Sequence, residues 1–182
     1  MDSAAAARPR PWLAVGAEIA HLLDQIDPRE FEALVEEFRD PGRRWFFSGQ
    51  GRSGLVAAMV AMRFMHLGRI AHLQGEATAP SIRRGDGILL FSGSGETPIT
   101  LHIAEIARRE GARVVVVTHK PQSTIARHAD TTLILAARRS VQFGGSLFEQ
   151  AALIVLDAVV YTLAGASPSV YRRMAHAHTN LQ

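Results

Sequence analysis

The sequence of 182 residues contains no cysteine, which excludes disulfides, thiolate nucleophiles and cysteine-ligated zinc or iron–sulfur sites. It also has little excess charge, because 20 Lys+Arg stand against 17 Asp+Glu for a net charge of +3. Without a basic cluster, the pI of about 10.1 does not indicate nucleic-acid binding. No apolar run approaches the ~20 residues of a membrane span, and the chain does not begin with a secretory signal. We therefore expect a cytoplasmic protein with no nucleic-acid or membrane partner.

The composition is that of a globular protein, with 47% hydrophobic and 20% charged residues. This is enough apolar material for the full core of one domain. We expect residues 1–11, which include an Ala-rich stretch, to form a flexible N-terminal arm. Residues 12–182 are expected to form a single domain that includes a C-terminal helix and tail.

Short apolar runs alternate with amphipathic segments along most of the chain. Two helices are predicted first, over residues 13–26 and from residue 28 onward, with Asp27 as N-cap and Pro28 at the first position of the second helix. Strands are predicted at 44–48, 70–73, 87–91, 113–118 and 131–135, and further helices at 53–67, 98–110, 123–128 and 146–163. This order predicts an α/β fold, a three-layer sandwich in which helices flank a five-stranded parallel sheet of the flavodoxin-like or Rossmann-like kind.

In such folds ligands bind beyond the carboxyl ends of the strands, and a glycine-rich loop follows the first predicted strand. Its sequence, Ser48-Gly49-Gln50-Gly51-Arg52-Ser53-Gly54, contains G-x-G-x-x-G, and Glu76 lies 22 residues beyond Gly54. This pattern matches a dinucleotide-binding fingerprint, in which backbone N–H groups hold phosphate at a helix N-terminus. It also fits a tight strand-to-helix turn that needs glycine for its dihedral angles.

A second loop, Ser92-Gly93-Ser94-Gly95-Glu96-Thr97, also follows a strand and precedes a helix. Its three hydroxyls and its free backbone N–H groups can supply the donors that the oxygens of a terminal phosphate require. Thr97 can also cap the helix that Pro98 begins. The loop predicts a phosphate-monoester site, and the alternative is a Ser-rich turn before a capped helix.

Several stretches together resemble the sugar isomerase (SIS) domain family and, more narrowly, the 6-phospho-3-hexuloisomerases. The resemblance runs from about residue 12 to the last residue. It is carried by residues 51–54, 61–68 (Ala-Met-Arg-Phe-Met-His-Leu-Gly), 75–80, 92–97, 129–130 and 145–150 (Gly-Ser-Leu-Phe-Glu-Gln), and by the ending His178-Thr179-Asn180-Leu181-Gln182. Two positions depart from the family: Gln182 stands where the family usually ends in Glu, and Ala177 stands where a basic residue is common.

The resemblance implies interconversion of D-arabino-hex-3-ulose 6-phosphate and fructose 6-phosphate through an enediolate, without cofactor or metal. This is a step of the ribulose monophosphate pathway, which serves formaldehyde fixation or pentose supply. The resemblance also implies dimers that pair into a homotetramer, with active sites near subunit interfaces. The expected site residues are Ser48, Gly49, Ser92, Gly93, Ser94 and Thr97 for the phosphate, Gln50, Gly51 and Glu76 for the sugar, and Glu149, His178 and Arg52 for catalysis.

The reaction needs a base for the carbon-bound proton and a group that stabilises the enediolate. Glu149 is the candidate base, because it begins an otherwise apolar helix where desolvation can raise a carboxyl pKa. The alternative is a capping box, in which Ser146 and Glu149 satisfy the N–H groups of the helix itself. In that case the helix dipole would lower the pKa of Glu149.

The other candidates also have structural alternatives. Arg52 could hold an enediolate oxygen or the phosphate, or could be a solvated loop arginine. His178 could assist ring opening or shuttle protons near neutral pH, or could belong to a frayed tail. Glu76 could touch sugar hydroxyls or cap a turn, and His66 is expected on a helix face. The helix at 146–163 is apolar nearly all round, which predicts self-association; a tail that reaches a neighbour's site would give His178 a partner.

Three competing functions stay open at this point. The protein could isomerise another sugar phosphate, such as a sedoheptulose or amino-sugar phosphate. It could be a phosphosugar sensor without catalysis, although the first ~40 residues are too short and too evenly charged for a DNA-binding helix-turn-helix. It could also bind a dinucleotide through Gly49, Gly51, Gly54 and Glu76.

Overall fold

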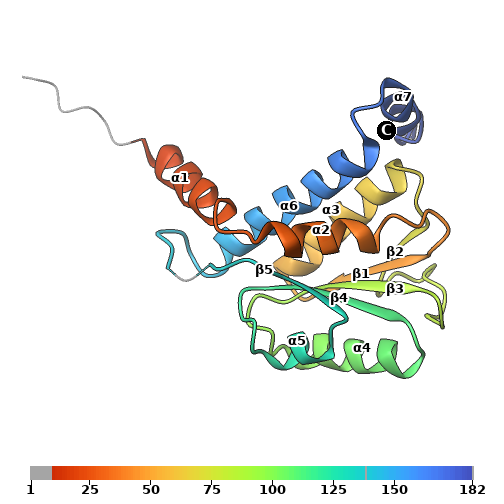
Figure 1. Cartoon of the computed structure of the whole chain (residues 1–182), viewed down its shortest axis with the longest axis horizontal. Helices are drawn as coiled ribbons and strands as arrows, with labels where there is room; N and C mark the ends of the chain where they lie inside the picture. Colours follow the sequence, from red (N-terminus) through yellow and green to blue (C-terminus); the bar gives the residue numbers. More distant parts are fainter. Residues whose placement is uncertain (1–9, 138, 182) are drawn as a thin grey trace, which may run out of the picture.

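The computed structural model describes residues 10–137 and 139–181. Nearly all of the predicted N-terminal arm therefore lies outside the described residues, as does the departure at Gln182. The helices are α1 (Pro11–Leu23), α2 (Pro28–Glu37), α3 (Arg52–His66), α4 (Pro98–Arg109), α5 (Thr124–His128), α6 (Ser146–Ala164) and α7 (Pro168–His176) (Figure 1). The strands are β1 (Trp45–Gly49), β2 (Ala71–Leu73), β3 (Gly87–Phe91), β4 (Arg113–Thr118) and β5 (Thr131–Ile134).

The five strands form one sheet in the order β2-β1-β3-β4-β5, and every neighbouring pair is parallel. This is the flavodoxin-like order, so the predicted α/β class and parallel sheet are confirmed. From β1 the chain continues to β2 at one edge of the sheet, and from β3 it continues to β4 and β5 toward the other edge. These two strands therefore flank the topological switch point, where α/β proteins of this kind bind ligands.

Helices cover both faces of the sheet, as the three-layer prediction requires (Figure 1). Side chains alternate along each strand, so Phe47 of β1 belongs to the core under α2, α3 and α6, whereas Phe46 faces α4 and α5. The first core is the larger and contains a cluster of aromatic rings: Phe38, Trp45, Phe47 and Phe64. The continuously apolar strands are thus explained by burial on both faces.

Local signals in the sequence place several helix ends correctly. Asp27 caps α2 and accepts a hydrogen bond from the Arg29 amide at 2.8 Å, with Pro28 at the first helical position. Helix α1 begins at Pro11, inside the predicted arm, and ends three residues before the predicted end at residue 26. Helix α7 has no counterpart among the predicted ranges, although Ser167 followed by Pro168 is a helix-start pattern.

Helix α6 corrects the expectation that no apolar segment approaches the length of a membrane span. Its 19 residues are long and apolar enough to cross a membrane by length and composition alone. Half of this span is buried in the fold, where α6 packs against α1, α2 and α3. This is the environment of the central helix of a core. The cover is incomplete, however, because Ile154 and Tyr161 are exposed.

Candidate functional site

The two glycine-rich loops lie side by side at the carboxyl edge of the sheet. Gly49, the last residue of β1, pairs in register with Phe91, the last residue of β3. The loop at residues 49–54 and the loop at residues 92–97 therefore leave the sheet from neighbouring positions at the switch point.

The first loop is a turn that only glycine can make. A Cβ atom on Gly49 would lie 2.6 Å from the carbonyl carbon of Ser53, and a Cβ on Gly54 would lie 2.8 Å from the Gly49 oxygen. Gly51, at the N-cap of α3, has φ +57°. The tight-turn interpretation thus accounts for all three glycines of the G-x-G-x-x-G pattern. The neighbouring Ser48 is buried, and its hydroxyl contacts the Gln74 side-chain oxygen at 3.0 Å.

The second loop uses part of its hydroxyl set internally. The Ser92 oxygen accepts from the Gly95 amide at 3.2 Å and lies 3.3 Å from the Thr97 hydroxyl. Thr97 does occupy the N-cap of α4, but its side chain makes no capping hydrogen bond. Ser94 is exposed, and within the described part of the chain the amides of Gly93 and Ser94 donate no hydrogen bond. The Ser94 oxygen accepts from the Glu96 amide at 3.2 Å, which leaves its O–H free to donate. The loop therefore offers an anion two free N–H groups and one O–H group.

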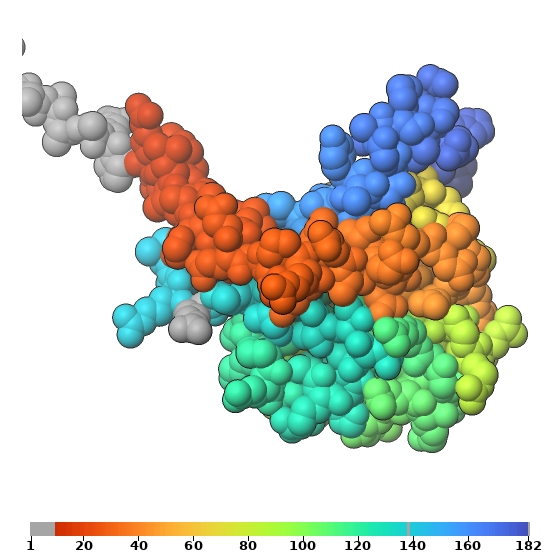
Figure 2. All heavy atoms as spheres, viewed as in Figure 1, coloured from red at the N-terminus to blue at the C-terminus, as the bar shows by residue number. Residues whose placement is uncertain are grey.

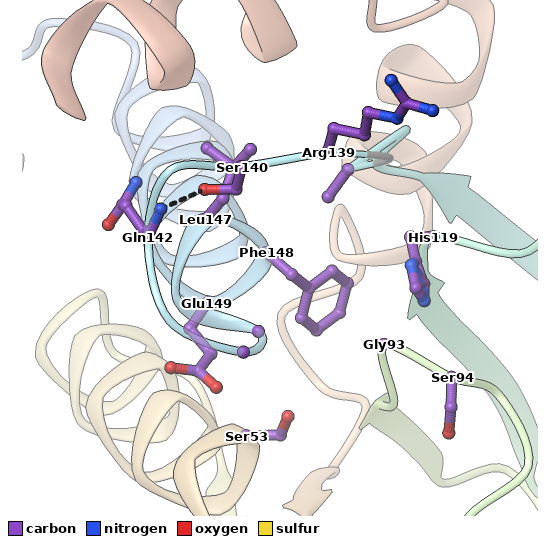
Figure 3. A pocket seen from close by; sticks show the side chains of 13 residues that line it. Ser53, Gly93, Ser94, His119, Arg139, Ser140, Gln142, Leu147, Phe148 and Glu149 are labelled. Atoms are coloured by element: carbon purple, nitrogen blue, oxygen red, sulfur yellow. Dashed lines mark hydrogen bonds between the residues drawn. The ribbon is translucent and has the colours of Figure 1, made fainter. Parts of the chain in front are cut away.

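A cavity of about 760 Å³ opens beside this loop (Figure 3). It brings together segments that are far apart in the sequence: the start of α3, the ends of β3, β4 and β5, and the start of α6. Its lining includes Ser53, Gly93, Ser94, His119, Arg139, Ser140, Gln142, Phe148 and Glu149. Of the predicted site residues, the structure thus places Gly93, Ser94 and Glu149 in one cavity.

Glu149 and Arg52 form an ion pair at one side of this cavity, with 3.0 Å between Oε1 and Nε. Arg52 also donates to the Ser146 hydroxyl at 3.1 Å, and that hydroxyl donates to the Phe143 carbonyl at 2.8 Å. Gly145 is the N-cap of α6 and has no side-chain capping bond. The capping-box alternative for Ser146 and Glu149 is therefore wrong. Arg52 is the first residue of α3, and its side chain is 48% exposed but paired with Glu149.

The environment of Glu149 suits a proton acceptor. Its side chain is 17% exposed, and burial raises its pKa above the ordinary value, while the nearby Arg52 charge partly opposes that rise. A carboxylate with a raised pKa accepts a carbon-bound proton more readily than a fully solvated one.

His119 and Arg139 also line the cavity, and sequence reasoning missed both. His119 follows β4 directly and lies against Phe148, with 6.2 Å between the ring centroids. Burial, and then the charge of Lys120, lower the pKa of His119, so its imidazole is neutral at neutral pH. Its position at the carboxyl end of a strand is the signal that could have identified it. Arg139, in the segment between β5 and α6, is an exposed cation at the cavity.

Other predicted residues lie apart from this cavity. Glu76 is exposed and lines a separate, mostly apolar hollow on the α4 face, beside Phe46 and Ile103. His178 stacks on His66, with 5.2 Å between ring centroids. Because His66 ends α3 and Arg52 begins it, the two sites are separated by about 20 Å along that helix. Within one chain, the structure does not bring Glu76 or His178 to Glu149.

The remaining predicted residues are not among those that line the cavity. These are Ser48, Gly49, Gln50, Gly51, Ser92 and Thr97, which belong to the two loops described above. No group of three or more His, Asp or Glu side chains suited to a metal ion occurs among residues 10–137 and 139–181.

Comparisons with known proteins agree with this geometry. The SIS domain model matches residues 37–161. The chain is 38% identical to the 3-hexulose-6-phosphate isomerase of Mycobacterium gastri over 91% of this chain and 86% of that protein. It is 36% identical to the Bacillus subtilis protein of the same name, over 75% of this chain and 79% of that protein.

A solved structure shares the fold. A Methanococcus jannaschii protein, for which the function of 3-hexulose-6-phosphate isomerase is inferred, superimposes with a TM-score of 0.82 at 28% identity. The match covers 94% of this chain and 99% of that one.

The fold, with its hydroxyl-bearing loop and half-buried carboxylate at the switch point, defines an α/β protein of the phosphosugar-binding class. The chain belongs to the SIS domain family, and within it to the family that includes the 3-hexulose-6-phosphate isomerases named above. The resemblance found in the sequence is thus confirmed.

Proposed function

We propose that this chain interconverts D-arabino-hex-3-ulose 6-phosphate and fructose 6-phosphate, and that Glu149 moves the hydrogen between carbons 2 and 3. The observation that carries this proposal is the position of Glu149, a carboxyl with a raised pKa in the same cavity as the Gly93–Ser94 segment. Family membership supports the substrate, because relatives with this activity match most of the chain.

The proposed reaction needs two proton movements. The Glu149 carboxylate removes the hydrogen on carbon 2 of the 3-ketose, which leaves an enediolate, and returns it to carbon 3. The hydroxyl proton on oxygen 2 moves to oxygen 3, so that the carbonyl ends on carbon 2. Arg52 lies beside Glu149 and supplies positive charge for the enediolate oxygens.

The phosphate end is assigned to the second loop. In the proposed complex, the substrate phosphate accepts hydrogen bonds from the free amides of Gly93 and Ser94 and from the Ser94 hydroxyl, just before α4. Ser92 and Thr97 hold the loop in shape, since their hydroxyls meet each other. Ser48, Gly49, Gln50 and Gly51 complete the rim from the first loop, and Glu76 has no part in the chemistry of its own chain.

The proposal includes assembly, in the cytoplasm, into dimers that pair as a homotetramer. Large apolar side chains are exposed on two neighbouring helices, Leu55, Met62 and Met65 on α3 and Ile154 and Tyr161 on α6. A second copy is the proposed cover for this surface. In such an assembly, His178 of one subunit can lie beside Glu149 of a neighbouring subunit, whereas within one chain the two residues are far apart.

The direct test incubates the protein with fructose 6-phosphate in deuterated water and follows both 3-hexulose 6-phosphate formation and deuterium on the sugar. We expect both with the wild type and neither with Glu149→Gln. Because transfer shielded from solvent would leave no label, formation of the 3-ketose is the deciding readout. Binding without any turnover would favour a phosphosugar sensor, and saturable micromolar NADH binding would favour the dinucleotide hypothesis.

A second experiment tests the shared site. Glu149→Gln and His178→Ala proteins are unfolded together and refolded as a mixture. If a neighbour supplies His178, mixed assemblies contain sites with both native residues and regain activity. If both residues act in one chain, the mixture stays as inactive as its parts.

A further inference from the structure

The wall of the cavity opposite α3 is the segment that joins β5 to α6, and it has little structure of its own. Residues 139–145 contain no helix or strand, and they present Arg139, Ser140 and Gln142 to the cavity. The apolar side chains of this segment point outward, because Val141 is 77% exposed and Phe143 is 88% exposed. Burial of its own side chains therefore does not fix this segment.

A single side chain from α1 supplies the missing contacts. Glu18 accepts from the Val141 amide at 2.7 Å, from the Ser140 hydroxyl at 2.8 Å and from the Gln142 side-chain amide at 3.3 Å. The Ser140 oxygen in turn accepts from the Gln142 backbone amide at 2.9 Å, a bond drawn in Figure 3. Among the described residues, every hydrogen bond from residues 139–142 to another element ends on Glu18.

Glu18 is itself held in place. Its helix α1 packs against α6, and the buried Leu22 and half-buried Ile19 and Leu23 of α1 belong to the core that α6 shares. The start of α1 projects from the body of the molecule, and its C-terminal end lies near α6 (Figure 1 and Figure 2). The hydrogen bond from Val141, with those from Ser140 and Gln142, lowers the pKa of Glu18. The carboxylate therefore stays ionised throughout the neutral range, as a stable acceptor for three donors needs to be.

We propose that Glu18 is a positioning residue of the isomerase, which fixes the Arg139–Gln142 wall of the cavity from α1. It touches no substrate, and it acts through the side chains that the wall presents. The proposed catalytic pair of Glu149 and Arg52 lies on α6 and α3 and makes no hydrogen bond to Glu18 or to residues 139–142; Arg52 reaches the other end of the segment, at Phe143, through Ser146. Loss of the contact thus loosens substrate binding and leaves the chemical step in place. This inference rests on the proposed function.

The test compares Glu18→Gln with Glu32→Gln. Gln keeps the size of Glu18 but removes its charge and replaces one acceptor oxygen by an N–H group, which weakens the charge-assisted hydrogen bonds from Ser140, Val141 and Gln142. Glu32 is exposed on α2 and makes no recorded hydrogen bond or ion pair within the described residues, so it controls for loss of one charge. Amide hydrogen exchange of Val141, the KM and kcat for fructose 6-phosphate, and its Kd by calorimetry are measured for both variants.

We expect Glu18→Gln to lose exchange protection at Val141 and to raise KM about tenfold, with kcat and the unfolding temperature unchanged. Unchanged KM would overturn the inference, whether or not protection falls. A parallel loss of kcat and thermal stability would also overturn it, because that pattern indicates a merely structural contact. If the wild-type protein shows no turnover, the proposed isomerase activity is rejected. In that case, an increased Kd for fructose 6-phosphate in Glu18→Gln but not in Glu32→Gln would still support the positioning role of Glu18.

Discussion

Two carboxylate–guanidinium pairs lie at opposite ends of the same parallel sheet, and their pKa values move in opposite directions. Glu37 and Arg113 meet at the amino ends of β4 and β5, whereas Glu149 and Arg52 meet at the carboxyl ends of the strands. Burial raises the pKa of both carboxyls. For Glu37 the hydrogen bonds from Arg113 and Thr131 outweigh burial and lower its pKa, whereas the Arg52 charge does not outweigh burial at Glu149.

The number of donors explains the difference. Arg113 donates to both oxygens of Glu37 at 2.7 to 3.1 Å, and Thr131 and Arg43 donate as well. Glu149 has Arg52 on one side and the open cavity on the other. A carboxylate whose acceptor positions are filled ties elements together, and one whose positions are open can react.

The largest expected effect is on turnover. Glu149→Gln removes the proposed base for the carbon-bound proton, so kcat/KM for fructose 6-phosphate should fall about 10³-fold. Glu37→Gln should leave kcat/KM unchanged, which provides the matched comparison. Equal losses in the two variants would mean that the pairs do not differ in function.

The next largest effect is expected on kcat, and it tests the proposed role of Arg52. Arg52→Gln removes positive charge from the enediolate and should lower kcat about 10²-fold. It also removes the one charge that lowers the pKa of Glu149. The acid limb of the kcat/KM profile should therefore move to higher pH; a shift to lower pH would contradict the proposed pairing.

At the other end of the sheet the expected loss is of stability. Glu37→Gln should lower the free energy of unfolding by about 2 kcal/mol, because the Glu37 carboxylate loses hydrogen bonds from Arg113 of β4, Thr131 of β5 and Arg43 in the loop before β1. Glu36→Gln, at a neighbouring exposed position whose one ion-pair partner among the described residues is Arg39, should cost about 0.5 kcal/mol or less. Urea unfolding at pH 7 measures both, and equal midpoints would contradict the structural role of Glu37.

The same pair predicts a pH dependence. Folding lowers the pKa of Glu37, so its stabilisation is complete above the ordinary value of 4.5 and is lost as the pH falls through the lowered value. The stability difference between the wild type and Glu37→Gln should thus shrink in acid. A difference that grows as the pH falls would have the wrong sign.

The smallest expected effect is on the stability of the catalytic variant. Because burial disfavours the Glu149 carboxylate, folding raises its pKa, and any stabilisation from this carboxyl is lost as the pH rises through that value. At pH 7 Glu149→Gln should therefore keep its unfolding temperature or gain about 1 °C, despite losing the ion pair. A loss of several degrees would indicate that Glu149, like Glu37, holds the fold together.

Much of the architecture could be predicted because it is encoded locally. The apolar run at Val114–Val117, the Asp27-Pro28 helix start and the glycines that follow β1 and β3 each act over a few residues. The class of the fold and the edge that carries the site follow from their order along the chain.

The details of the site depend on packing, which the local pattern does not contain. Ser146 and Glu149 have the spacing of a capping box, but Arg52 reaches both from another helix and replaces that arrangement. His119 stands alone in the sequence and gains its role only where the end of β4 meets Phe148. The sequence makes His178 a catalytic candidate without indicating whether it serves its own subunit or a neighbour, and within one chain it stacks on His66.

The most direct test of this account is a titration of the Glu37 and Glu149 side-chain carboxyls in one sample of substrate-free protein, by carbon-13 NMR with Glu37→Gln and Glu149→Gln for assignment. We predict a pKa above 4.5 for Glu149 and below 4.5 for Glu37. A Glu149 pKa at or below that of Glu37 would contradict the claim that the carboxyl edge of the sheet holds a carboxylate ready to take a proton from carbon.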